Sequence, residues 1–180
     1  MNEQILDTLA NIGVTLAAFS GVVGAFRARG PNKWSPTEFR VLWFLILDSF
    51  LVVFFALLPI PLALAQLSPG VLWALCSAFL GSWFLVGTVL ALAGERRDHI
   101  ARRAVKVPVI TPILYGVMVL LPVLGVALWL SVWDVVPRGQ ALYVTGLIAL
   151  LVVAALEFLF FIGIAALGTE KESALKENSD

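Results

Sequence analysis

Two acidic side chains, Asp48 and Glu157, lie inside long apolar segments of this 180-residue chain. Asp48 lies roughly 10 Å past the start of its segment, and Glu157 roughly 15 Å before the end of its own. Neither segment contains Lys, Arg or His. Because an unpaired, ionised carboxylate in hydrocarbon costs several kcal/mol, each acid is expected to bind a proton or to face water.

Other polar residues fall at a similar depth and would complete a polar layer in the cytoplasmic half of the membrane. This set comprises Ser20, Ser49, Thr88 and Tyr115. Two interpretations of the layer are open. In the structural one, the protonated acids donate hydrogen bonds to hydroxyl groups or to carbonyl groups that prolines leave free, and so hold the helices together. In the functional one, the acids form a proton or cation site, since ionisable groups within a membrane are commonly functional.

The remaining reactive residue types predict no further chemistry. The single histidine, His99, has no ligand neighbours at metal-binding spacing, so we expect no metal site. The single cysteine, Cys76, excludes an intramolecular disulfide and a CxxC site. The chain lacks the common hydrolase, phosphate-binding and metalloprotease motifs, and its net charge of zero suggests no nucleic-acid partner. We therefore expect that the protein is not an enzyme and that it has no catalytic residue and no cofactor.

The elements that position the two acids are expected to be membrane-spanning helices. The chain is 61% hydrophobic and 13% charged, against about 45–50% and about 25% in a soluble domain. Apolar runs of about 20 residues are long enough to cross a bilayer. They predict an all-α, polytopic bundle over 1–167 with five transmembrane helices, at about 5–26, 41–66, 71–94, 109–133 and 141–167, and a charged cytoplasmic tail at 168–180. Prolines near the end of the second span, Pro59 and Pro61, predict a kink or a stop.

The distribution of basic residues predicts the orientation of the bundle. Of the 12 Lys and Arg residues, all but Arg138 fall on one side when five spans alternate. Since Lys and Arg concentrate on the cytoplasmic side, we expect the N-terminus outside and the C-terminus in the cytoplasm. Aromatic residues near the span ends agree with an interfacial belt, and only Trp83 lies well inside a span. The belt comprises Trp34, Trp43, Trp73, Trp129, Trp133 and Tyr143.

Small residues along the first span recur at every fourth position and predict close helix packing, within the subunit or between subunits. They are Gly13, Ala17, Gly21 and Ala25. A second, polar stripe lies on roughly the opposite face. Two interpretations of this helix are open: it lies at the centre of the bundle, or the polar stripe forms the wall of a shallow vestibule open to the outer side. The polar stripe comprises Glu3, Asp7, Asn11 and Thr15.

A basic cluster follows the third span and is a candidate contact for anionic lipid head groups. It comprises Arg96, Arg97, Arg102, Arg103 and Lys106. The alternative is that these residues only determine the topology.

The first third of the chain carries a set of short motifs: AFSGVV at 18–23, Arg29-Gly30, Trp34 and Glu38-x-Arg40. These motifs resemble the start of a group of small bacterial multi-pass inner-membrane proteins with no assigned function. The resemblance implies a bacterial inner membrane and no particular site residues.

Two hypotheses for the function follow from the sequence. The first is a non-enzymatic membrane component that forms a homo-oligomer or a complex with another membrane protein. The alternative is a small channel or carrier for protons or cations that uses Asp48 and Glu157.

Overall fold

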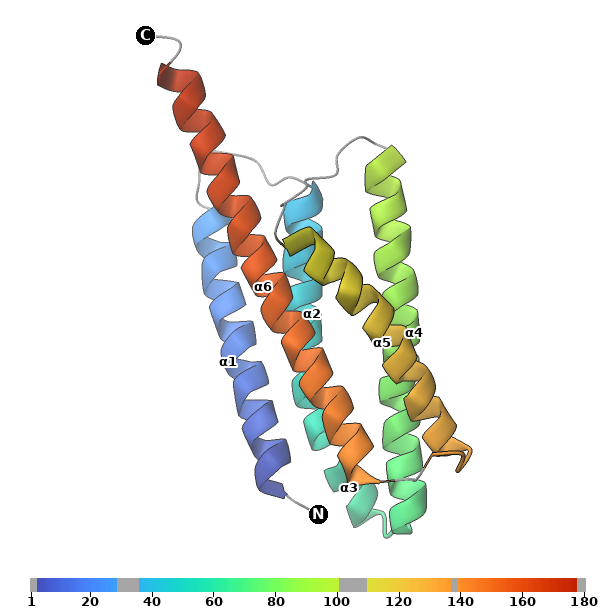
Figure 1. Cartoon of the computed structure of the whole chain (residues 1–180). Helices are drawn as coiled ribbons and strands as arrows, with labels where there is room; N and C mark the ends of the chain where they lie inside the picture. The colour runs from blue at the N-terminus through green and yellow to red at the C-terminus, as the bar shows by residue number, and fades with distance from the viewer. Residues whose placement is uncertain (1–2, 29–35, 101–109, 137–138, 178–180) are drawn as a thin grey trace.

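The computed structural model describes residues 3–28, 36–100, 110–136 and 139–177, which form an all-α bundle (Figure 1). The helices are α1 (Glu3–Ala28), α2 (Pro36–Leu57), α3 (Pro59–Leu64), α4 (Pro69–Ile100), α5 (Ile110–Val132) and α6 (Gln140–Glu177). The N-terminus and the C-terminus lie at opposite ends of the bundle, and the last turns of α6 extend beyond the other helices.

Five segments of these helices are long and apolar enough to cross a membrane, as the sequence predicts. They are Gln4–Ala25, Phe39–Leu64, Pro69–Gly94, Tyr115–Val132 and Gln140–Gly163. Two helices continue past the predicted spans. The α4 helix runs on to Ile100, and α6 runs through the predicted tail as far as Glu177.

The helices pack in two groups that meet along α6. The first group is α1, α2 and α6, in which α2 lies against both neighbours. The second is the α4–α5 pair, in which α5 crosses α4 obliquely (Figure 1). The side chains that join the two groups therefore determine how the bundle is held together.

The second span breaks at Leu58, where α2 ends and α3 begins, so the predicted effect of the prolines is confirmed. Pro59 has no N–H, and the Phe55 carbonyl therefore lacks its usual partner four residues on. The buried Tyr143 hydroxyl of α6 donates to this carbonyl at 2.6 Å. Tyr143 is fully buried against Trp73 and is not part of an interfacial belt, which corrects the expectation from the sequence. The Tyr143 hydroxyl thus donates the hydrogen bond that Pro59, which lacks an N–H, cannot donate to Phe55.

Replacing Tyr143 with phenylalanine is expected to lower the free energy of unfolding by about 1–3 kcal/mol, because it leaves a buried carbonyl without a donor. In a Pro59→Ala background residue 59 regains its N–H, so the same replacement should cost less. The free energies of unfolding in detergent of wild type, Tyr143→Phe, Pro59→Ala and the double variant give the cost of the tyrosine replacement in each background. Equal costs in both backgrounds would show that the tyrosine does not replace the missing donor. Thr145→Ala is the control, because the exposed Thr145 hydroxyl bonds only within α6.

The α4 and α5 helices touch backbone to backbone at a pair of glycines. A Cβ added to Gly81 would lie 3.0 Å from the Gly125 carbonyl oxygen, and one added to Gly125 would lie 3.1 Å from the Gly81 carbonyl oxygen. Small residues permit such an approach between helices in lipid. This crossing fixes the position of α4, which carries Trp83 towards the α2–α6 interface.

The predicted packing stripe on α1 is only partly on the inner face of the subunit. Gly13 is buried, and an added Cβ there would lie 3.1 Å from the Ser49 carbonyl oxygen. Ala17 is half-buried. Gly21 and Ala25 lie on the outer surface, and an added Cβ at Gly21 meets nothing within 4 Å.

Only the first half of the stripe therefore packs within the subunit, and contact of the second half with another subunit stays a prediction. A step of four residues turns about 40° beyond a full turn, so a strict four-residue stripe drifts around the helix. The buried face of α1 instead alternates between steps of four and three, through Leu6, Ala10, Gly13, the half-buried Ala17, Ser20 and Gly24.

Candidate functional site

The two predicted acids come together at the interface of α2 and α6. Asp48 lies on α2 and is 6% exposed, while Glu157 lies on α6 and is half-buried. Their carboxyl groups are close enough to interact electrostatically. The two acids lie in the half of the bundle that contains the end of α1, the start of α2 and the end of α4. The sequence placed both acids in this half, but did not predict that they form a pair.

A tryptophan from the other helix group completes the site. The Trp83 side chain of α4 forms a hydrogen bond with the Asp48 carboxyl group, and the indole N–H can only donate. This role of Trp83 was not predicted from the sequence. The available signal was that Trp83 alone among the tryptophans lies well inside a span, where its N–H needs a partner.

Three of the four predicted hydroxyl groups are buried in the same half of the bundle and donate within their own helices. Ser20, Ser49 and Thr88 are buried, and each hydroxyl donates to the carbonyl four residues earlier at 2.7 Å. A hydroxyl has one hydrogen, so each is used within its own helix. Tyr115 is 46% exposed, on the surface of α5 rather than in the buried group. The structure therefore brings the two acids together with Trp83, keeps Ser20, Ser49 and Thr88 buried in the same half, and places Tyr115 on the surface.

The pair has hydrogen-bonding capacity that the described part of the chain does not use. Oδ1 of Asp48 and Oε2 of Glu157 are buried and have no hydrogen-bond partner there. Two carboxylates at one site cannot both stay charged at low cost, because burial and mutual repulsion both disfavour the second charge. The arrangement is therefore suited to holding a positive charge, either a proton or a cation, between the two acids.

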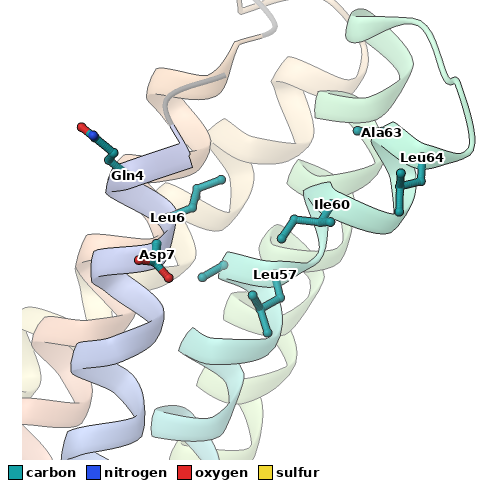
Figure 2. A pocket seen from close by; sticks show the side chains of 8 residues that line it. Gln4, Leu6, Asp7, Leu57, Ile60, Ala63 and Leu64 are labelled. Carbon is teal, nitrogen blue, oxygen red and sulfur yellow. The ribbon is translucent and has the colours of Figure 1, made fainter.

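A cleft at the opposite end of the bundle lies between α1 and the α2–α3 break (Figure 2). Its volume is about 590 Å³, and it is lined by Gln4, Leu6, Asp7, Ala56, Leu57, Ile60, Ala63 and Leu64. Asp7 is the one member of the predicted polar stripe among these residues. The cleft therefore lies beside the first turns of α1, whereas Asn11 and Thr15 of the stripe are exposed outside it.

Buried apolar side chains separate this cleft from the acids. Along α2, Asp48 and Ala56 are about 12 Å apart, with Val52 and Phe55 buried between them. On α6, Leu147, Leu150 and Ala154 are buried over the matching stretch. Neither acid is among the residues that line the cleft.

Part of the predicted basic cluster lies outside the described residues. Arg96 and Arg97 are exposed on the last turns of α4, whereas Arg102, Arg103 and Lys106 are not described. Nearby, Arg40 of α2 donates to the Gly94 carbonyl of α4 at 3.1 Å. This bond joins the two helix groups at the basic end of the bundle, where Arg40, Arg96 and Arg97 lie.

Three hydrogen bonds between α4 and the first group lie at different depths in the described part of the chain. They are Arg40 to Gly94, Trp83 to Asp48, and the hydrogen bond between Cys76 and Tyr143. The bond at intermediate depth, between Trp83 and Asp48, is the one that involves an acid. The described residues contain no group of three or more His, Cys, Asp and Glu side chains able to hold a metal ion.

In comparisons with known proteins, no family model, curated protein or solved structure matches the chain.

Proposed function

We propose that this chain is a multi-pass membrane protein that carries protons or small cations, with Asp48 and Glu157 as its ion-binding groups. The observation that supports the proposal is the buried pair of carboxyl groups, each with an oxygen that lacks a hydrogen-bond partner in the described residues. The structural interpretation receives less support, because Oδ1 of Asp48 and Oε2 of Glu157 form no hydrogen bond to another helix in the described residues.

The setting we propose is a bacterial inner membrane, with the N-terminus outside and the C-terminus in the cytoplasm. The basic residues support this orientation, because they concentrate at one end of the predicted spans. Ions would then reach the acids from the cytoplasmic end. The function needs no covalent chemistry, so we propose that the protein is not an enzyme.

Flux into proteoliposomes tests the proposal. Wild type should dissipate an imposed pH or cation gradient, and Asp48→Asn should reduce the flux to that of protein-free vesicles, since an amide cannot take up or release a proton at neutral pH. Ser49→Ala is the matched control, because Ser49 is the buried neighbour of Asp48 and does not titrate. The proposal fails if wild type gives no flux above protein-free vesicles, or if Asp48→Asn conducts as well as wild type.

Association with a second copy or another membrane protein is a second candidate role. The outward-facing glycine on α1 favours it, because Gly21 leaves open space at the surface of the subunit, and small residues commonly mark contacts between membrane helices.

We expect Gly21→Leu to leave the unfolding midpoint of the subunit unchanged and to dissociate the oligomer. Sizing in detergent and crosslinking in membranes measure the oligomeric state, with Gly70→Leu as the control at another open glycine. An unchanged oligomeric state would mean that this face contacts lipid.

A further inference from the structure

The cleft between α1 and the α2–α3 break has the size and the lining of a site for a small molecule (Figure 2). Its volume of about 590 Å³ falls within the usual range of such pockets, about 300–1,000 Å³. Six of its eight lining residues carry aliphatic side chains. Three of these side chains, Leu57, Ile60 and Leu64, are exposed, so they are accessible to an apolar group of a ligand.

The cleft lies near the end of the membrane-crossing segments. Leu64 is the last residue of the segment Phe39–Leu64, and Asp7 lies about 5 Å inside the segment that begins at Gln4. At this depth the apolar interior of a membrane meets water. An amphiphile would therefore keep its apolar part in the membrane and its polar head near water.

Asp7 gives the cleft a negative charge that no lining residue neutralises. The lining contains one carboxylate and no Lys, Arg or His. Asp7 is exposed, and in Figure 2 it lies at about the level of Leu57. A carboxylate in this position repels an anion and loses hydration when a neutral apolar group covers it, whereas a cation compensates for that loss. The charge therefore favours a cationic head group over a phosphate or a carboxylate.

The break between α2 and α3 adds a backbone acceptor beside this charge. Residue 61 is a proline, so the Leu57 carbonyl lacks its usual N–H donor four residues on. The Phe55 carbonyl, which Pro59 affects in the same way, accepts from Tyr143. Leu57 instead lines the cleft and is the last residue of α2. The C-terminal ends of interrupted membrane helices attract cations, because their carbonyl groups carry partial negative charge.

We propose that this cleft binds a protonated amine with an apolar chain, whose ammonium group lies between Asp7 and the Leu57 carbonyl and whose chain lies against Ile60 and Leu64. An ammonium group has several N–H donors, so it can donate to both acceptors, and its hydrogen bond to the carboxylate is charge-assisted. The site is separate from the acid pair, since Val52 and Phe55 are buried between them. The inference therefore goes beyond the proposed ion-carrying function and does not depend on it.

Equilibrium binding of dodecylamine to the full chain in phosphatidylcholine nanodiscs tests the inference, with empty nanodiscs as the baseline. The amine is protonated at neutral pH, as a lysine side chain is. We expect saturable binding to wild type, and binding at least about 10-fold weaker for two analogues with the same chain. Dodecyltrimethylammonium carries the positive charge without an N–H, and dodecanoate carries a negative charge. Affinity for either analogue equal to that for dodecylamine would overturn the choice of a protonated amine.

Asp7→Asn tests the position of the ammonium group, because it removes the charge with little change in shape. Binding of dodecylamine should weaken at least about 10-fold. Asp134→Asn is the matched control. Asp134 is exposed, follows α5 at the same end of the bundle and does not line the cleft (Figure 1), and asparagine tolerates its positive φ of 64°. Equal affinity of wild type and Asp7→Asn for the amine would overturn the proposal.

Ala63→Phe tests the position of the apolar chain, because it places an aromatic ring at the lining of the cleft. We expect it to abolish saturable binding. Ala65→Phe is the control, since Ala65 is exposed two residues further on and does not line the cleft. Unchanged binding in Ala63→Phe would place the amine elsewhere on the protein and overturn the proposal.

Replacing phosphatidylcholine with phosphatidylethanolamine separates a free amine from a membrane lipid. Phosphatidylethanolamine carries a primary ammonium group beside a phosphate, for which the cleft has no basic lining residue. Dodecylamine should therefore bind wild type equally well in both lipids. Loss of binding in phosphatidylethanolamine would show that a membrane lipid occupies the cleft, which overturns the proposal. No ion gradient is present in these measurements, so their outcome is independent of whether the acid pair carries ions.

Discussion

Gly125→Leu is expected to lower the free energy of unfolding by about 3 kcal/mol or more, because it forces α4 and α5 apart. The added side chain would begin 3.1 Å from the Gly81 carbonyl oxygen, 3.2 Å from the Phe84 Cβ and 3.3 Å from the Leu85 Cγ. The closest of these atoms belongs to the backbone, so the strain cannot be relieved by rotating a side chain. Unfolding of purified protein in mixed detergent measures the loss.

Gly116→Leu is the matched control on the same helix, since an added Cβ at Gly116 meets nothing within 4 Å. We expect it to leave the unfolding midpoint near that of wild type. If the two leucine variants lose the same stability, α4 and α5 do not cross at the glycine pair.

Glu157→Leu is expected to raise the free energy of unfolding by about 1–3 kcal/mol, because it removes a buried polar atom that has no partner. It also removes the electrostatic interaction with Asp48. Asp48 is less suitable for this test, since its replacement would leave the Trp83 N–H without an acceptor. Flux should be lost in the same variant, as expected where a functional site is maintained at the expense of stability.

Comparison with Glu157→Gln separates the two interpretations of the acid. If Glu157 donates a hydrogen bond that holds helices together, the amide should keep the stability of wild type, and leucine should lower it by about 1 kcal/mol or more. A loss of stability in Glu157→Leu would therefore support the structural interpretation and count against an ion site.

The sequence predicted the features that depend on one helix at a time. Five apolar runs determined the five spans, since length and hydrophobicity are properties of a single segment. The break after α2 followed from Pro59, whose missing N–H acts locally. Asp48 and Glu157 were recognisable as candidates because each is an acid within its own apolar run.

The features that the sequence did not predict depend on how two helices meet. Whether Asp48 faces Glu157, or Trp83 reaches Asp48, is determined by the rotation and offset of packed helices, which hydrophobicity hardly constrains when most faces are apolar. The same holds for the approach of Gly81 to Gly125. Tyr143 was misassigned to the membrane interface for a related reason: its partner, the Phe55 carbonyl, belongs to another helix.

Proton flux through a set of four proteins tests most directly whether the two acids form one proton-carrying site. The set is wild type, Asp48→Asn, Glu157→Gln and the double variant, each reconstituted at the same density into vesicles that contain a pH-sensitive dye. Residues that act as one unit give strongly non-additive effects. We therefore predict that each single variant falls to the flux of protein-free vesicles and that the double variant is no lower. Partial flux in both single variants, with a further loss in the double variant, would contradict a shared site, and full flux in all four would contradict any role for the pair.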